Sequence, residues 1–235
     1  MALSGTAFLA LWNDRAEDRA DYEAWHSREH IPERLGIPGI LAGRRFVDGD
    51  GPLPAYFTIY ALADLEVLSS PAYAAVVGQP TPWSRSMRPA LSRMYRRGCS
   101  TQLSLGAGVA GHLAATLLRR RDGAENVAAF ATIADMPPIS ALHLGQVRDI
   151  APLPFEQPPS DDLPAADAIL LIEGFDEASF AASLDSVDLL IARSGHQRLL
   201  DWTCYRLAFA LDQDDVSGAL LPSDALLGHF GRNVA

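Results

Sequence analysis

The strongest constraint on the fold is an order of secondary-structure elements that occurs twice along the chain. Short apolar runs predict strands, and side chains of one kind recurring every three or four residues predict helices. The first half gives the order strand, helix, strand, strand, helix, strand. Its expected elements are a strand at 6–12, a helix at 18–35, strands at 40–48 and 55–62, a helix at 65–77 with a break or restart at Ser69-Ser70-Pro71, and a strand within 90–105.

The same order returns in the second half. Its expected elements are a strand at 113–119, a helix at 124–134, strands at 141–150 and 168–175, a helix at 177–193 and a strand at 201–211. Short matches support a duplication, since Tyr95-Arg96 corresponds to Tyr205-Arg206 and Asp64 to Asp176. The order of the elements carries more weight than these matches.

A unit of this order forms a four-stranded antiparallel sheet with both helices on one face. The other face still needs a cover, because strand side chains point alternately to the two sides. Two such sheets in one chain cover each other. The sequence therefore predicts an α+β fold in which two repeats, 1–108 and 109–212, form a pseudo-two-fold barrel with helices outside. A tail at 213–235 follows.

Two segments lie outside the repeats. Residues 152–164 contain five prolines, too many for a helix or a central strand. We expect an extended surface loop there, with a lid over a pocket as the alternative. In the tail, residues 223–229 are expected to form a short helix that packs on the body or on a partner chain.

Composition excludes several functions. The net charge of −10 argues against nucleic acid and anionic membranes as partners. All 19 basic residues are arginine, so Schiff-base, pyridoxal-phosphate and P-loop chemistry lack their lysine. Two cysteines are too few for a disulfide framework or a thiolate zinc site. We see no signal peptide and no membrane-spanning stretch, and expect a cytoplasmic protein.

One side of the helix at 18–35 holds the side chains suited to chemistry: Tyr22, Trp25, His26, Glu29, His30 and Glu33. His26 and His30, four residues apart, lie close together on that side. An imidazole exchanges protons near neutral pH, and Glu29, Glu33 or Tyr22 could orient it or act as a second acid or base. Such a cluster suits isomerisation, dehydration or aldol-type cyclisation.

Three other interpretations of this histidine pair remain open. The histidines could be interfacial residues that are satisfied by hydrogen bonds. They could chelate zinc, although the usual zinc-protease pattern has Glu directly after the first His, where this chain has Ser27. His26 could also be a surface residue, leaving His30 alone at the site. We expect no metal.

The first half resembles the dimeric α/β-barrel superfamily, near its EthD-like branch, including bacterial proteins of that group. The similarity covers roughly residues 5–97. The matching motifs are Trp25-His26-x-x-Glu29-His30-Ile31-Pro32-Glu33-Arg34, Ile37-Pro38-Gly39-Ile40, Gly43-Arg44-Arg45-Phe46, Leu68-Ser69-Ser70-Pro71-Ala72-Tyr73 and Pro80-Thr81-Pro82-Trp83. In the second half only the order of elements matches.

The resemblance implies ferredoxin-like repeats that pair into a barrel, with a ligand cleft between helix and sheet. It implies a functional histidine at His30. Relatives include muconolactone isomerases, polyketide cyclases, quinone-forming monooxygenases and haem proteins, so it names no single reaction. Relatives more often have Tyr where this chain has His26. The second repeat has Pro137 and Pro138 near the equivalent place and no paired histidine, which argues against a second site.

Other residues give weaker signals. Arg44 and Arg45 point to opposite faces of their strand, so one of them could meet a carboxylate or phenolate ligand, with a rim salt bridge as the simpler interpretation. A basic group could either balance acidic residues or bind an anion, and we favour charge balance. The group consists of Arg85, Arg88, Arg93, Arg96 and Arg97. The aromatic residues Trp12, Tyr56, Tyr60, Trp83 and Tyr95 fit a core or a pocket wall. We interpret His112, His143, His196 and His229 as structural, with His196 as the candidate haem ligand.

These observations predict a cofactor-independent isomerase, lyase or cyclase acting on a small, largely apolar carbonyl or phenolic compound. His30 is the expected acid or base, His26 its partner, and Glu29 or Tyr22 the orienting group. The substrate-binding residues are expected to be Trp25, Arg45, Tyr60, Trp83 and Tyr95. The alternatives are a haem-binding protein or cofactor-free monooxygenase, and a non-catalytic binding protein. The chain is expected to be a monomer with an internal barrel or a homodimer.

Overall fold

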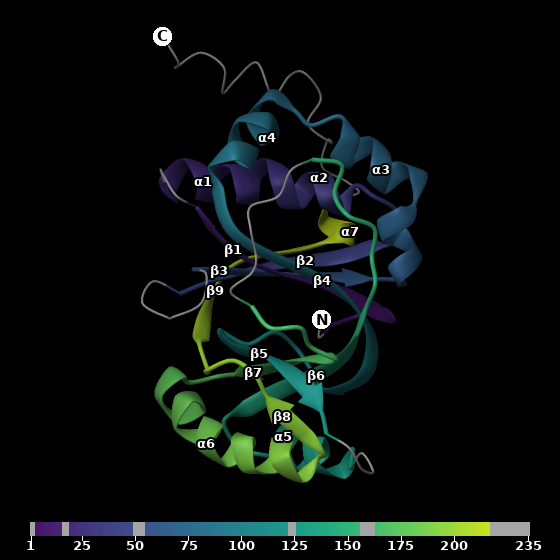
Figure 1. The fold of residues 1–235 in the computed structure, drawn as a ribbon. Coiled ribbons are helices and arrows are strands. Elements are labelled where there is room, and N and C mark those ends of the chain that lie inside the picture. The colour runs from purple at the N-terminus through teal and green to yellow at the C-terminus, as the bar shows by residue number, and fades with distance from the viewer. Residues whose placement is uncertain (1–2, 16–18, 49–54, 122–125, 156–162, 217–235) are drawn as a thin grey trace.

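The computed structural model describes residues 3–15, 19–48, 55–121, 126–155 and 163–216. Its strands are β1 (Ala7–Arg15), β2 (Ile40–Val47), β3 (Tyr56–Leu62), β4 (Leu91–Gly106), β5 (His112–Arg120), β6 (Ile139–Arg148), β7 (Ala168–Gly174), β8 (His196–Arg198) and β9 (Cys204–Asp212). Eight of them close into an antiparallel barrel, because β7 at one end of the sheet order also pairs with β5. The helices of the first half cover one side of the barrel, and the two longer helices of the second half cover the other (Figure 1).

The first repeat follows the expected order of elements. Its helical segments are α1 (Arg19–Trp25), the π-helical η1 (His26–His30), α2 (Ile31–Leu35), the 3-10 helix η2 (Leu65–Ser69), α3 (Pro71–Gly78), α4 (Pro82–Met87) and η3 (Arg88–Ala90). Its strands lie side by side in the order β4-β1-β3-β2. The predicted restart is confirmed, since the Ser70 hydroxyl accepts a hydrogen bond from the Tyr73 backbone N–H and caps α3.

The second repeat has the same arrangement. Its helices are α5 (Ala128–Ala134) and α6 (Glu177–Arg193), and α7 (Gln213–Val216) follows its last strand. Its strands lie in the order β6-β7-β5-β9, which is the order of the first repeat read from the other end. The two repeats join at two seams, β4 with β6 and β2 with β9. The predicted α+β fold of two paired βαββαβ repeats is therefore confirmed.

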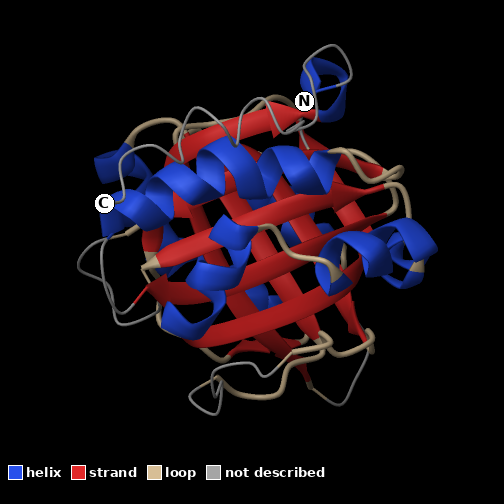
Figure 2. Cartoon of the chain, turned by 90° about the horizontal axis from the view of Figure 1, so that it is seen from above, coloured by secondary structure: helices blue, strands red, loops and turns tan. Residues whose placement is uncertain are grey.

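The inside of the barrel is a packed core. Large apolar side chains from both repeats meet there, and Figure 2 shows helices lying across the strands that enclose them. The core includes Phe8, Ala10, Trp12, Phe57, Ile59, Tyr95, Leu113, Ala115, Leu117, Ile169, Leu171 and Tyr205. Because side chains alternate along each strand, the other half of the strand residues face the helices outside. Any ligand space must therefore lie between helix and sheet.

One end of the barrel interior holds a buried polar group that links the repeats. Arg44 Nη1 lies 2.7 Å from Glu173 Oε1, and both side chains are almost fully buried. The other Glu173 oxygen accepts a hydrogen bond of 3.0 Å from the Ala110 backbone N–H. His143 Nε2 lies 3.5 Å from Glu173 Oε1, and its Nδ1 lies 2.8 Å from the Ser104 hydroxyl. A first-repeat arginine is thus neutralised by a second-repeat carboxylate.

Several element boundaries differ from the sequence expectation. The helix expected at 18–35 is interrupted by the π-helical turn η1, and helix α4 and strand β8 were not expected. The last strand begins at Cys204 rather than at residue 201. The helix expected at 223–229 lies outside the described residues.

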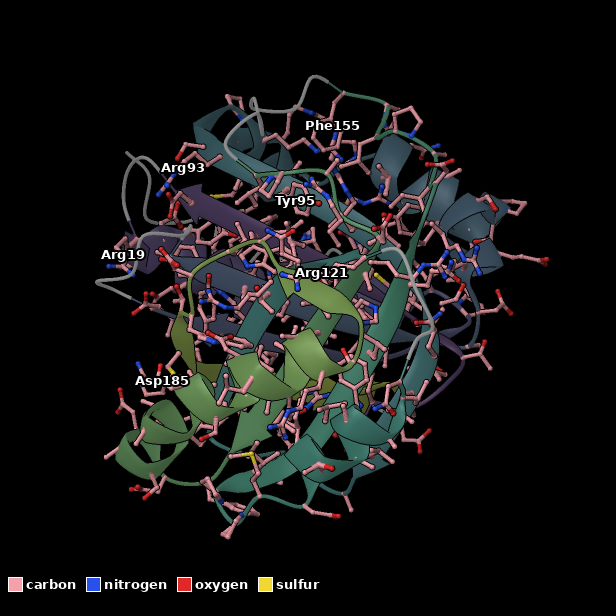
Figure 3. All side chains as sticks on the ribbon, turned by 60° about the horizontal axis from the view of Figure 1, so that its bottom comes forward. Arg19, Arg93, Tyr95, Arg121, Phe155 and Asp185 are labelled. Carbon is pink, nitrogen blue, oxygen red and sulfur yellow. The ribbon has the colours of Figure 1, made fainter. Side chains whose placement is uncertain are left out.

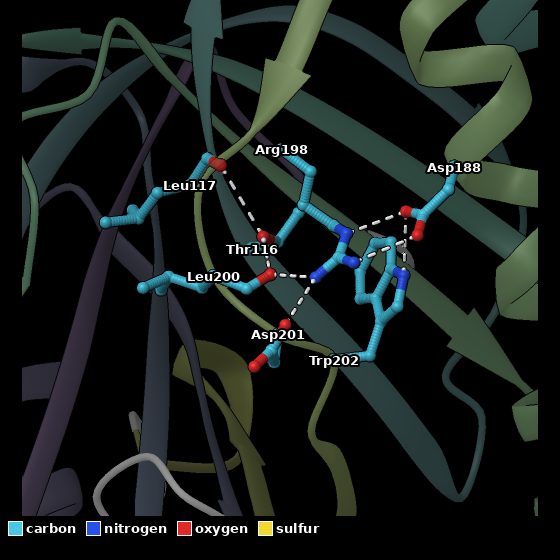
Figure 4. Close-up of polar contacts among 7 residues, drawn as sticks. All are labelled: Thr116, Leu117, Asp188, Arg198, Leu200, Asp201 and Trp202. Carbon is cyan, nitrogen blue, oxygen red and sulfur yellow. Dashed lines mark hydrogen bonds and ion pairs between the residues drawn. The ribbon is translucent and has the colours of Figure 1, made fainter.

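Strand β8 and the residues after it are fastened to helix α6 by a polar cluster (Figure 4). Arg198 holds Asp188 with two contacts, Nε at 2.7 Å and Nη2 at 3.0 Å, and Trp202 Nε1 donates to the same carboxylate at 3.0 Å. Arg198 also donates to the Leu200 carbonyl. This irregular segment escaped the strand prediction because side-chain bonds, not apolar periodicity, hold it.

Candidate active site

A cavity lies between the first-half helices and the outer face of the first-half sheet. Strand residues that share the helix-facing side form its floor, among them Leu9, Leu11, Thr58 and Tyr60. The space open to the centres of water molecules is about 80 Å³, and a single water needs only ~10–15 Å³. The cavity therefore accepts several waters or a small ligand.

Both histidines of the predicted pair line this cavity. Their ring centroids are 4.9 Å apart, and the Trp25 ring lies 4.4 Å from that of His30. His26 is buried, and His30 is partly buried where it lines the cavity. The pair predicted from the sequence thus meets at one enclosed surface.

The helix widens into a π-helical turn where it carries the histidines. The backbone N–H of Ile31 donates to the carbonyl of His26, five residues earlier. Pro32 supplies the local reason, because it has no N–H for the Arg28 carbonyl and its ring would clash with that carbonyl in a regular α-helix. Single π-helical turns inside α-helices occur mostly at functional sites.

Burial and neighbouring charge keep both imidazoles neutral. The pKa of His30 lies well below its usual value, first because of burial and then because of the charges of Arg34, Arg45 and Arg88. Burial likewise lowers the pKa of His26, followed by the charge of Arg45. In each ring Nδ1 is buried and has no hydrogen-bond partner among the described residues. Both rings are therefore in the neutral form near pH 7, the form that can act as a base.

Two hydroxyl groups on the sheet face the same cavity without partners. The Tyr60 hydroxyl and the Thr58 hydroxyl are both buried, and neither makes a hydrogen bond within the described part of the chain. Burial raises the pKa of Tyr60, so its phenol stays protonated. A buried hydroxyl without a partner is costly, so a polar ligand atom is the natural partner for each.

The two glutamates nearest the histidines in the sequence, Glu29 and Glu33, have different positions. Glu33 lines the cavity, and burial raises its pKa despite the Arg34 guanidinium 2.9 Å away. Glu29 points elsewhere, accepting hydrogen bonds from Thr81 and, at 2.9 Å, from Ser84. The expectation that Glu29 orients a histidine is therefore corrected, since its carboxylate fastens the helix to α4.

Tyr22, expected as an orienting group, and Trp25, expected to bind substrate, both line the cavity. The Tyr22 hydroxyl accepts a hydrogen bond of 2.6 Å from Asn13, and Trp25 Nε1 donates to Ser84 at 3.1 Å. Arg45 does not line the cavity but packs against the rings of Tyr22 and Tyr56. Its guanidinium lies 4.6 Å from the Tyr22 ring centroid and 4.2 Å from that of Tyr56.

Two of the predicted binding residues lie away from the cavity. Trp83 is half-buried on α4, and its Nε1 donates to Asp21 at 3.1 Å. Tyr95, which is labelled in Figure 3, faces the barrel interior and packs edge-on against Trp12. The predictions for Trp83 and Tyr95 miss because aromatic character alone does not reveal which side of a strand or helix a residue takes.

Several lining residues were not predicted as site residues. Arg34, Arg88, Arg96 and Tyr73 reach the cavity from the helices and β4. Leu153 and Phe155 add a wall from the proline-rich connection between β6 and β7, in the second repeat. The described part of that connection, up to residue 155, thus forms part of the cavity wall. In the sequence, the basic group contained Arg88 and Arg96, the matching motifs contained Arg34 and Tyr73, and the five prolines marked the connection.

The equivalent space in the second repeat is filled. Phe130 and Ile133 of α5 and Phe180 of α6 pack on the outward side chains of β6 and β7. Within the described residues, no three His, Cys, Asp or Glu side chains gather as a metal site requires. No helix in those residues is long and apolar enough to cross a membrane.

Comparison with solved structures identifies proteins of similar fold. The structure resembles that of an anthrone oxidase-like protein, with a TM-score of 0.65 and 9% sequence identity. The match covers 94% of this chain and 99% of the anthrone oxidase-like chain. The chain has the dimeric α/β-barrel fold. Its structure also resembles a provisionally assigned chlorite dismutase, with a TM-score of 0.52, 13% identity and coverage of 92% and 99%.

A provisionally assigned monooxygenase from Fusobacterium nucleatum is similar as well, with a TM-score of 0.50, 12% identity and coverage of 88% and 95%. No protein-family model matches the sequence, and no curated protein sequence matches it either. Sequence identities of 9–13% show a shared fold alone.

Proposed function

We propose that this protein is a cofactor-independent acid–base enzyme that removes a proton from a small, largely apolar carbonyl or phenolic compound. One observation carries the proposal. Two neutral imidazoles, His26 and His30, line one enclosed cavity beside the unpartnered hydroxyls of Tyr60 and Thr58. The proposal places the chain near the EthD-like branch that its first half resembles.

In this mechanism His30 accepts the proton from an acidic C–H or O–H of the ligand, and the electron pair moves onto the ligand oxygen. The Tyr60 hydroxyl donates a hydrogen bond to that oxygen, which stabilises the enolate or phenolate. The charges of Arg34 and Arg45 oppose the imidazolium but favour the ligand anion formed with it. Return of the proton to another atom of the ligand completes an isomerisation, and loss of a leaving group completes an elimination.

The proposal includes no haem, and the residue that the sequence offered as its axial ligand has another environment. His196, the candidate axial ligand, is buried against Phe130 with its Nδ1 2.9 Å from the Ser194 hydroxyl. An absorption spectrum after addition of haemin tests this, and we expect no Soret band from a bound haem.

A cofactor-free monooxygenase is a second candidate, because it would begin with the same proton removal. The folds of an anthrone oxidase-like protein and of a provisionally assigned monooxygenase are similar to this one. The apolar walls formed by Leu9, Leu11 and Leu153 would shield an enolate from water. The two candidates differ only in whether the ligand anion then meets a proton or dioxygen.

The test measures proton removal directly. Full-length protein is mixed in D₂O near pH 7 with 2-indanone, 2-tetralone or anthrone, and NMR follows exchange of the acidic C–H. We expect exchange faster than in buffer, and a loss of about 10²-fold or more in His30→Gln, the usual worth of acid–base catalysis. His112→Gln is the matched control, because it removes an imidazole outside the cavity lining.

Unchanged exchange in His30→Gln would remove that residue from the mechanism. Exchange no faster than in buffer with all three ketones would count against an enzyme of this class and favour a binding protein. An oxygen electrode decides between the two catalytic candidates. Oxygen uptake with anthrone that requires His30 assigns the oxygenase, and exchange without uptake assigns the isomerase or lyase class.

A further inference from the structure

Two arginines of the cavity wall are held by the same two segments. Arg96 donates from Nη2 to the Tyr73 hydroxyl at 3.1 Å and from Nη1 to the Ala151 carbonyl at 3.1 Å. Arg88 donates to the Val77 carbonyl at 2.7 Å, and its guanidinium lies 4.1 Å from the centroid of the Phe155 ring. Both are thus anchored on α3 and on the 151–155 segment. They share one end of the cavity.

Neither guanidinium has a carboxylate partner within salt-bridge distance among the described residues. Arg96 is 8% exposed and bonded only to a hydroxyl and a carbonyl, and its Nε is buried with no partner. Burying a cation without a counter-ion is costly. This occurs in a chain with ten more acidic than basic residues, yet within the described residues no carboxylate lies within salt-bridge distance of either guanidinium at this end.

The remaining charges of the cavity do not supply the missing anion. Glu33 is the one carboxylate among the lining residues, and Arg34 already holds it at 2.9 Å. Arg45, behind the Tyr22 wall, adds a further buried cation whose Nε and Nη2 have no partner in the described chain. The cavity is therefore positive overall, with Arg88 and Arg96 at its Tyr73 end.

The walls around the two guanidiniums are apolar. Leu153 and Phe155 close this end from the second repeat, and Val76 and Val77 close it from α3. A small planar acid fits such walls, because its ring takes the apolar contacts and its carboxylate takes the guanidinium donors. A fully hydrated polyanion would leave these walls without a partner.

We propose that the ligand of this cavity is a ring compound bearing a carboxylate, which Arg96 and Arg88 bind. The carboxylate accepts hydrogen bonds from Arg96 Nε and from the Arg88 guanidinium. The reacting carbonyl or hydroxyl then faces His30 and Tyr60. The second half of this arrangement rests on the proposed function, whereas the recognition of the carboxylate rests on the arginines alone.

The experiment compares an acid with its neutral analogue. Calorimetric titration of full-length protein with 3-hydroxybenzoate and with 3-hydroxybenzamide measures the preference for the carboxylate. We expect wild-type protein to prefer the acid by about 10-fold or more, the usual worth of a hydrogen bond to a charged group. Arg96→Met and Arg88→Met each remove a charge and keep the apolar stem, and each should abolish most of that preference.

The control is Arg85→Met, which removes an exposed arginine on α4 that is bonded to the Pro80 carbonyl. It should leave the preference unchanged. Because Arg96 joins β4 to α3 and its loss could unfold the chain, Arg88→Met provides the second variant. Equal binding of acid and amide by wild-type protein, no binding of the acid, or an unchanged preference in folded Arg96→Met and Arg88→Met would each overturn the proposal.

His30→Gln separates this proposal from the proposed function. It should keep the preference for the acid while losing proton exchange. If the protein prefers the acid but neither wild type nor any variant accelerates proton exchange, carboxylate recognition is supported and the proposed enzymatic function is contradicted. If exchange depends on His30 but acid and amide bind equally, the enzymatic function is supported and carboxylate recognition is contradicted.

Discussion

The imidazole rings of His26 and His30 lie 4.9 Å apart across a π-helical turn, and both face one cavity. The turn is closed by the bond from the Ile31 N–H to the His26 carbonyl. Neither imidazole is charged near pH 7, because burial lowers both pKa values. The wall of the cavity thus holds two neutral bases and two arginines, Arg88 and Arg96.

Pro32 should control this geometry. Pro32→Ala introduces a backbone N–H at position 32 that can donate to the Arg28 carbonyl, so the turn can close as regular α-helix. We expect thermal stability to stay equal or rise, because Ala is the best helix former, while proton exchange falls as the histidines shift. Circular dichroism melting and the exchange assay check the two effects. Full exchange activity in Pro32→Ala would show that the π-helical turn is dispensable.

Acid should destabilise the protein from pH 6.5 downward. Below that pH the unfolded chain protonates His26 and His30, whereas the folded chain resists because their folded pKa values are lowered. The unfolded state then binds more protons, so the free energy of unfolding falls with pH, by up to about 1.4 kcal/mol per pH unit for each histidine. The loss continues down to the folded pKa values.

Urea unfolding at several pH values measures this slope. In the double variant His26→Gln/His30→Gln the part of the slope due to these residues should disappear. A slope below pH 6.5 that is equal in wild-type and double-variant protein would contradict the assignment of buried neutral imidazoles.

Breaking the buried pair between the repeats should cost far more than breaking an exposed one. Glu173→Gln leaves the Arg44 charge buried without a counter-ion, and we expect a loss of about 3–5 kcal/mol in the free energy of unfolding. Asp188→Asn removes the partner of Arg198 at a partly exposed site (Figure 4), where about 1 kcal/mol or less is expected. Urea denaturation compares the two variants, and similar losses would contradict the structural role of Glu173.

Tyr60→Phe should separate activity from stability. The variant removes a buried hydroxyl that has no partner among the described residues, so the free energy of unfolding should not fall. Proton exchange should fall by about 10²-fold or more, because the donor to the developing oxyanion is lost. An unaltered exchange rate would show that another group, such as the Thr58 hydroxyl, stabilises the anion.

The repeated order of elements made the barrel predictable, because each strand and long helix has its own periodic signal. The long helix α6 was predicted with its observed bounds, Glu177–Arg193. Short elements such as α4 and β8 were missed, since three to six residues show too little periodicity. Strand β8 is also held by its pairing with β5, where Arg198 lies opposite Leu118, a residue distant in the sequence.

The histidine pair was predictable because both rings come from one helix with a fixed spacing. The site formed by the two arginines was not predictable from the sequence. Its residues Arg88, Arg96 and Phe155 come from three segments that only the fold brings together. The basic group was interpreted as charge balance, and the structure separates its members. Arg93 pairs with Asp14, whereas Arg88 and Arg96 have no carboxylate partner in the described chain.

The most direct test of the account is an NMR titration of the imidazole nitrogens in ¹⁵N-labelled full-length protein, with the signals of His26 and His30 assigned by their Gln variants. We predict that both rings remain neutral as the pH falls below 6.5. Protonation of both rings at pH 6.5 or above, as for histidines in free solvent, would contradict the buried neutral pair on which the proposed chemistry depends.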